Sequence, residues 1–146
     1  MEQHSEADLK QFVGDLLRHG GLGVHVNVWD TYLALAIGSF LELESTVNTV
    51  TFVDSLQQPP FGFLMTPRSV MPSLDVVYAG VRCCELLRLP VRYAREAIGF
   101  ILSCQTSDGG FSHAPSALPN LEFTYRALQT LALLAPSLQP LASEAL

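Results

Sequence analysis

The sequence predicts an all-α fold of helical hairpins, with about six helices in three repeated units. Three observations support this prediction. Apolar residues recur at helical spacing, residues that cap or break helices separate the apolar segments, and a pattern of glutamine, glycine and aromatic residues repeats along the chain. Because 49% of the 146 residues are apolar and only 15% are charged, the helices need extensive contact with one another.

The first unit is expected over residues 5–43. Ser5 can cap a helix whose apolar residues follow an amphipathic stripe, and His19-Gly20-Gly21 supplies its stop. Asn27 can cap a second helix that runs to about Leu43. This second helix is apolar on nearly all sides, so we expect it to be an inner helix.

The second unit is expected over residues 45–89. Its first helix can begin at Ser45 or Thr46 and end near Gln57, although the β-branched residues of this segment are also typical of a strand. The neighbouring units favour a helix. A proline-containing loop follows, and the next helix is expected to begin at Ser73 and end at about the end of the unit.

The third unit is expected over residues 90–136, with a tail over 137–146 that should fray. Its helices should extend from Val91 to Cys104 and from about Pro119 to Ala135, where Pro136 stops the second one. The three units and the tail together form one domain over the whole chain.

The repeat is clearest between the second and third units. Four residues recur after 48 positions: Phe52, Gln57, Gly62 and Phe63 correspond to Phe100, Gln105, Gly110 and Phe111. A glutamine at a helix end can bind unpaired backbone groups, glycine permits a positive φ, and the aromatic ring can fill the seam between units. The first unit has a shorter loop and matches over Thr31-Tyr32-Leu33-Ala34-Leu35.

The sequence Cys-Gln-Thr-Ser-Asp-Gly-Gly-Phe at 104–111, followed by Thr-Tyr-Arg-Ala-Leu at 124–128, resembles the repeat of protein prenyltransferase β subunits and squalene or terpene cyclases. In that superfamily, outer and inner helices alternate in an α/α toroid around an apolar cavity that binds an isoprenoid. The resemblance implies this fold, whereas periodicity alone implies stacked hairpins. A closed toroid takes roughly twice as many helices, so the chain should form half of one.

Half a ring exposes two edges and an apolar inner face to water, which is unfavourable. A second half related by a two-fold axis would close the ring. We therefore expect a homodimer or a complementary partner chain, enclosing an apolar small-molecule substrate.

Other partners and locations are disfavoured by composition. The net charge of −6 is opposite to the basic surface of a nucleic-acid-binding protein. No apolar run reaches the roughly 18 residues of a membrane span, and the N-terminus lacks the features of a signal peptide. The three cysteines do not form a disulfide framework. We expect a cytoplasmic protein with no nucleic-acid partner and no membrane span.

Two carboxylates are catalytic candidates. By resemblance to protonating terpene cyclases, Glu122 takes the place of the acid when aligned on Thr124, and Asp75 takes it in the second unit. The two flanking carboxylates of the family motif are missing. Either residue could protonate a polyene or an epoxide if an apolar cavity raised its pKa. Alternatively, each simply complements the dipole of its helix from the first turn.

Aromatic residues near the starts of the inner helices could line the cavity and stabilise a carbocation, or could serve inter-helix packing. Arg82 belongs to an arginine cluster that, by resemblance, could hold a diphosphate or form a solvated face. The expected substrate-binding residues are Trp29, Tyr32, Tyr78, Phe123, Tyr125 and Arg82.

We expect no cofactor and no metal. Protein prenyltransferases bind zinc through Asp, Cys and His, but the Asp-x-Cys pair is missing at the corresponding place. The sequence does contain Cys83, Cys84, Cys104, Asp108 and His113. Cysteines at helical positions are more often small core residues.

Two functions follow as hypotheses. In the first, the protein binds an isoprenoid or polyene and transforms it by acid-initiated cyclisation or isomerisation. In the second, it is a non-catalytic repeat module that docks a protein partner. Prenyl transfer to a protein is a weaker third hypothesis. The environment of Glu122 and Asp75 should discriminate between the first two.

Overall fold

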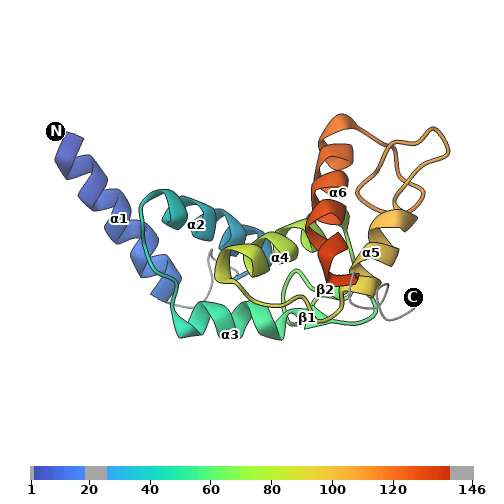
Figure 1. Cartoon of the computed structure of the whole chain (residues 1–146). Helices are drawn as coiled ribbons and strands as arrows, with labels where there is room; N and C mark the ends of the chain where they lie inside the picture. The colour runs from blue at the N-terminus through green and yellow to red at the C-terminus, as the bar shows by residue number, and fades with distance from the viewer. Residues whose placement is uncertain (1, 19–25, 139–146) are drawn as a thin grey trace.

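The computed structural model describes residues 2–18 and 26–138. This part of the chain contains six α-helices, one short two-stranded sheet and a 3-10 helix, and Figure 1 shows how the helices are arranged. The elements are α1 (Glu2–Arg18), α2 (Val28–Phe40), α3 (Val47–Ser55), β1 (Gln57–Gln58), β2 (Gly62–Phe63), α4 (Leu74–Leu87), α5 (Ala94–Ser103), α6 (Leu121–Leu134) and the 3-10 helix η1 (Ala135–Leu138). None of the described helices is long and apolar enough to cross a membrane.

Three inner helices pack side by side in the order α2, α4, α6, and each outer helix α1, α3 or α5 packs against at least one of them. In Figure 1, α1 lies at one end of the molecule, and α5 and α6 lie at the other. The helix α4 is the centre of the core, because nine of its fourteen residues are buried. The predicted all-α architecture of about six helices, in hairpins of one outer and one inner helix, is confirmed for the described residues.

Polar side chains begin four of the helices by accepting a hydrogen bond from a backbone N–H of the first turn. These caps are Asn27, Thr46, Ser73 and Asn120. The caps expected at Asn27 and Ser73 are confirmed, as is the helical state of α3. The expected start at Ser5 is wrong, because α1 already begins at Glu2. Its expected stop at 19–21 lies outside the described residues.

Several helix ends differ from the prediction for reasons in the tertiary structure. The helix α2 ends at Phe40 instead of Leu43, and Glu42 has a φ of 57°. The helix α3 ends at Ser55, because Gln57 pairs with β2. The helix α5 begins at Ala94 instead of Val91, and the segment before it is bound to a side chain of the second unit.

Gln57 supplies that binding. Its side-chain nitrogen donates to the carbonyl of Pro90 (3.1 Å), and its side-chain oxygen accepts from the N–H of Arg92 (2.9 Å). Gln57 itself is buried. The residue therefore joins the second unit to the third.

The predicted repeat corresponds to a repeated hairpin. Gln57 pairs with Phe63 in the sheet, and Gln105 pairs with Phe111 through an isolated bridge. Gly62 has a φ of 99°, and a Cβ there would lie 2.9 Å from the Cβ of Ala97, so both conformation and space require glycine. The same spacing of residues therefore folds in the same way in both units.

Each hairpin also binds the inner helix of the preceding unit. The carbonyl of Met65 accepts from the N–H of Val28 (2.9 Å), the first residue of α2. The carbonyl of His113 accepts from the N–H of Leu74 (2.7 Å), the first residue of α4. These bonds connect successive units in one direction along the array.

The helix α2 is an inner helix, as expected, but not all of its apolar sides are covered. Leu35 is buried, but Leu33, Ile37 and Phe40 are exposed. The helix packs against α4 on one side and α1 on another. It is an inner helix at the edge of the array, where one apolar side has no neighbour in the described part of the chain.

Candidate functional site

The N-terminal ends of the inner helices meet around one arginine. The guanidinium of Arg126 on α6 donates to a carboxylate oxygen of Asp75 (2.6 Å) and of Glu122 (2.5 Å). Its central carbon lies 4.8 Å from the ring centre of Trp29 and 5.8 Å from that of Tyr78. A cation in this position is attracted by both carboxylates and by the faces of both rings. We call these five residues with Tyr32 the arginine–aromatic cluster.

Three rings of the cluster contact one another. The centres of Trp29 and Tyr32 lie 5.7 Å apart, those of Tyr32 and Tyr78 lie 5.6 Å apart, and those of Trp29 and Tyr78 lie 6.2 Å apart. The Tyr32 and Tyr78 pairing is edge-to-face, a favoured arrangement of aromatic rings. These contacts connect α2 with α4.

Burial raises the pKa of Tyr78 to about 12, and the hydrogen bond with Tyr32 adds to this rise. The two hydroxyl oxygens lie 3.4 Å apart. Tyr78 is therefore protonated near neutral pH, and it serves as a hydrogen-bonding group and not as a base.

Arg82 borders the cluster on the side of Tyr32. Its guanidinium carbon lies 5.7 Å from the Tyr32 ring centre, and it forms a 3.0 Å ion pair with Glu85. Its Nε is buried and has no hydrogen-bond partner among the described residues. Arg82 therefore retains one unused donor beside the aromatic rings.

A family model described as "Prenyltransferase alpha-alpha toroid domain" matches residues 6–146, nearly the whole chain. The chain belongs to this family. The match confirms the resemblance that was drawn from the repeat motifs. No curated protein matches the sequence.

Most of the residues expected in the site lie together in this toroid domain. Trp29, Tyr32, Tyr78 and Arg82 are in or beside the cluster, with Asp75 and Glu122 on its rim. Two others lie elsewhere. Phe123 packs against the ring of His113, at 5.7 Å between centres, and Tyr125 is exposed.

Both candidate acids lie in the first turn of their helices and are partly open to water. The side chain of Asp75 is 36% exposed and that of Glu122 is 63% exposed. Both carboxylates form ion pairs with Arg126 at this partly exposed rim. This is the environment expected of carboxylates that complement their helices and a neighbouring cation.

Sequence reasoning missed Arg126. One signal was present, because Glu122 and Arg126 are four residues apart on an otherwise uncharged helix, the spacing of a favourable pair. The second partner, Asp75, is 51 residues away in the sequence and is brought near by the packing of α4 on α6.

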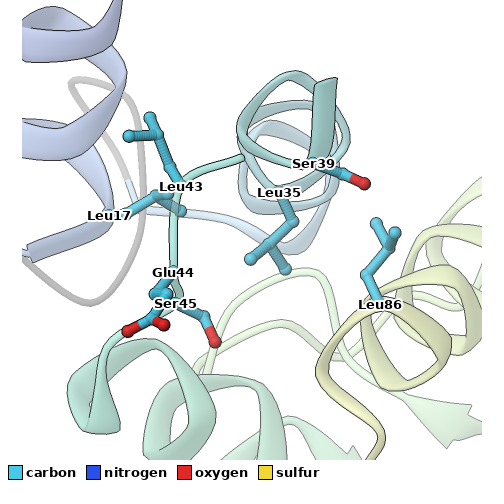
Figure 2. Close-up of a pocket in the computed structure, with 7 residues that line it drawn as sticks. All are labelled: Leu17, Leu35, Ser39, Leu43, Glu44, Ser45 and Leu86. Atoms are coloured by element: carbon cyan, nitrogen blue, oxygen red, sulfur yellow. The ribbon is translucent and has the colours of Figure 1, made fainter. Parts of the chain in front are cut away.

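Two hollows adjoin the inner helices. One of about 270 Å³ lies beside the cluster and is lined by Trp29, Met65, Ser73, Asp75 and Val76. A larger hollow of about 410 Å³ lies near the C-terminal ends of α2 and α4, where Figure 2 shows leucines from different elements around an open space. Its lining is Leu17, Leu35, Ser39, Leu43, Glu44, Ser45 and Leu86. Only the smaller hollow contains expected site residues.

The cysteines of the toroid domain are core residues. Cys83, Cys84 and Cys104 are free and buried. Burial raises the pKa of Cys84 to about 12 and that of Cys104 to about 11, and it raises the pKa of Cys83 further. These thiols are protonated near neutral pH, so they are poor nucleophiles there. Within residues 2–18 and 26–138, no three metal-binding side chains of His, Cys, Asp or Glu lie together.

Proposed function

We propose that this toroid domain binds an apolar isoprenoid or polyene against the inner faces of α2, α4 and α6. The cavity is completed by a second copy or by a complementary partner chain. One observation carries the proposal: the rings of Trp29, Tyr32 and Tyr78 gather on α2 and α4, and Trp29 lines a hollow of about 270 Å³. An apolar ligand enclosed against these rings is removed from water, which is favourable by about 25 cal/mol per Å² of apolar surface.

The cluster supplies polar groups in such a cavity. The hollow beside Trp29 and Asp75 has room for one end of a ligand. Aromatic faces that now contact Arg126 can stabilise positive charge on a bound hydrocarbon. A ligand that displaces the guanidinium gains these faces and frees the carboxylates.

As the chemical step, we propose acid-initiated isomerisation or cyclisation with Asp75 as the proton donor and Glu122 as the alternative. The acid's O–H bond breaks, the π pair of a C=C bond forms the new C–H bond, and a carbocation is left on the neighbouring carbon. Loss of a proton from an adjacent carbon to the carboxylate restores the acid and completes the balance. Asp75 is favoured because it is the less exposed and lines the hollow.

The second candidate is a non-catalytic partner module. The ion pairs of Arg126 with Asp75 and Glu122 favour it, because a structural role in bridging α4 and α6 accounts for both carboxylates without any catalytic role. A cytoplasmic location belongs to either proposal and is supported by the three buried free thiols.

Tryptophan fluorescence tests the binding proposal, because Trp29 is the one tryptophan of the sequence and belongs to the cluster. Titration of the full chain with farnesol should change its emission saturably, whereas octanol should do so only at much higher concentration. Equal weak responses to both alcohols would contradict the proposal.

Product analysis tests the chemical step. Incubation with squalene should give products of unchanged mass, detected by gas chromatography and mass spectrometry, and Asp75→Asn or Glu122→Gln should abolish them while the Trp29 response to farnesol remains. Binding without products in the unmodified protein would favour the non-catalytic module.

A further inference from the structure

The three inner helices begin at equivalent residues, Val28, Leu74 and Leu121. The first two of these residues are 0% exposed, whereas Leu121 is 88% exposed. A second set of equivalent residues lies about two helical turns further along each helix. It follows the same trend: Leu35 is 6%, Val81 is 2% and Leu128 is 57% exposed. The same positions that are covered on α2 and α4 are therefore open on α6.

The tyrosines at one repeat position show the same difference. Tyr78 on α4 is 6% exposed, and its equivalent Tyr125 on α6 is 65% exposed. The backbone agrees, because the N–H groups of Val28 and Leu74 donate to the hairpin of the following unit. Within the described part of the chain, Leu121 has no such acceptor. The α6 face formed by Leu121, Tyr125 and Leu128 thus lacks a following unit.

The opposite edge, on α2, is also uncovered in the described part of the chain. Cys83 of α4 faces α2, since its Sγ lies 3.8 Å from the carbonyl oxygen of Val28. Counted from the first helical residue, the position of Cys83 on α4 is held by Ile37 on α2, and that of Ala79 is held by Leu33. Cys83 and Ala79 are buried, whereas Ile37 and Leu33 are each 42% exposed.

These exposed residues of α2 line a hollow of about 270 Å³ with residues of α1, which we call the α1–α2 groove. Its lining is Phe12, Val13, Leu16, Asp30, Leu33, Ala34 and Ile37. The one charged side chain in it, Asp30, accepts a 2.8 Å hydrogen bond from the side chain of Asn27. The α6 face contains no charged residue. Contact between these two surfaces therefore leaves no charge buried without a partner.

We propose that the α6 face of a second copy of this chain occupies the α1–α2 groove, and that the contact is made twice around a two-fold axis. This inference rests on the proposed function, which left open whether a second copy or a different partner chain completes the cavity. It names the second copy. The reason is that each surface already meets its counterpart inside the chain, where α2 packs on α4 and α4 packs on α6. Two such contacts close the array without a free edge.

The internal contact also specifies which residues meet. The approach of Cys83 to Val28 corresponds, across the new interface, to an approach of Ile37 to Leu121 of the second copy. The double variant Ile37→Cys, Leu121→Cys should therefore form a covalent dimer on mild oxidation, whereas each single variant should remain separable in a denaturing gel.

Sedimentation velocity of edge variants tests the contact itself. The groove variant is Leu33→Glu with Ile37→Glu, and the α6 variant is Leu121→Glu with Leu128→Glu. Every contact uses one groove and one α6 face, so each variant alone should be monomeric. A mixture of the two restores one intact contact and should give a heterodimer, which also shows that both variants fold. Val70→Glu, at an exposed loop position outside both surfaces, should leave the dimer unchanged.

The outcomes separate this inference from the proposed function. A groove variant or α6 variant that remains dimeric would overturn the inferred contact. If farnesol still changed the Trp29 emission saturably, the binding proposal would stand. If the unmodified protein is monomeric and binds farnesol, only the inferred contact with a second copy is overturned. If it is dimeric and does not bind farnesol, the contact is supported and the proposed function is contradicted.

Discussion

The helices α4 and α6 are equally long and begin in the same way, yet they differ in what covers them. Each has fourteen residues, a polar side-chain cap and an acidic residue in the first turn. Nine residues of α4 are buried, and only three of α6 are. The difference follows from position, because α4 has an inner helix on both sides and α6 has one on a single side. Burial in this array is set by the neighbouring units.

The largest contrast should come from Leu74 and Leu121, the first residues of the two helices. Leu74→Ala removes a fully buried side chain and should lower the free energy of unfolding by about 2–5 kcal/mol. Leu121→Ala should change the stability of the isolated chain by less than about 0.5 kcal/mol. Urea unfolding at a concentration where the chain is monomeric measures both, and equal losses would refute the difference in burial.

Gly80 of α4 should tolerate no side chain. A Cβ there would lie 2.2 Å from the ring of Phe63, so Gly80→Ala should cost about 1–3 kcal/mol by overpacking. Gly99 of α5 is the matched control, because nothing lies within 4 Å of its added Cβ. Gly99→Ala should stabilise the helix by about 0.5–1 kcal/mol. Thermal unfolding followed by circular dichroism should shift in opposite directions for the two variants, and shifts of the same sign would contradict the packing described for Gly80.

The two hairpin glutamines offer a sharper comparison. Gln57→Ala removes a buried side chain together with its part-buried hydrogen bonds to the N–H of Arg92 and the carbonyl of Pro90, and should cost about 1–3 kcal/mol. Gln105 is exposed and donates only to the nearby carbonyl of Gly109, so Gln105→Ala should cost less than about 0.5 kcal/mol. Hydrogen exchange at the start of α5 should accelerate in the first variant alone. Unchanged protection there would show that Gln57 does not hold the two units together.

The smallest expected effect is on the folding stability at alkaline pH. Below pH 10, Tyr78 is protonated in the folded and unfolded chains, so it contributes no pH dependence. Between pH 10 and about 12 the unfolded chain loses this proton first, and stability should fall as the pH rises. The buried cysteines with raised pKa values add to this decline, so Tyr78→Phe should make it shallower in denaturant midpoints without abolishing it. A decline that is insensitive to Tyr78→Phe would contradict the raised pKa.

Local signals predicted much of the fold. The caps at Asn27 and Ser73 act within one turn, so the sequence reveals them. The start of α5 was misplaced, and the segment before it is bound to Gln57, which is 35 residues before Arg92. The hairpin pairing was predictable from its repeat, since the equivalent glutamine and phenylalanine pair in both units, although the glycine with positive φ is Gly62 in one and Gly109 in the other.

The candidate site was predictable only in part. Tyr32, Tyr78 and Tyr125 share one repeat position, and the rings of the first two contact each other. Tyr125 is exposed because α6 is the last inner helix of the described chain. A repeat pattern alone does not indicate which unit has no neighbour. Arg126 escaped notice because its partners lie on two other helices.

The central claim is that the open face of α6 and the α1–α2 groove are two halves of one interface. Sedimentation equilibrium of the unmodified chain at micromolar concentration tests it most directly. The account predicts a species of twice the 15.9 kDa chain mass, which the groove and α6 variants each convert to the single chain mass. A stable single chain at that concentration, with both faces open to water, would contradict it.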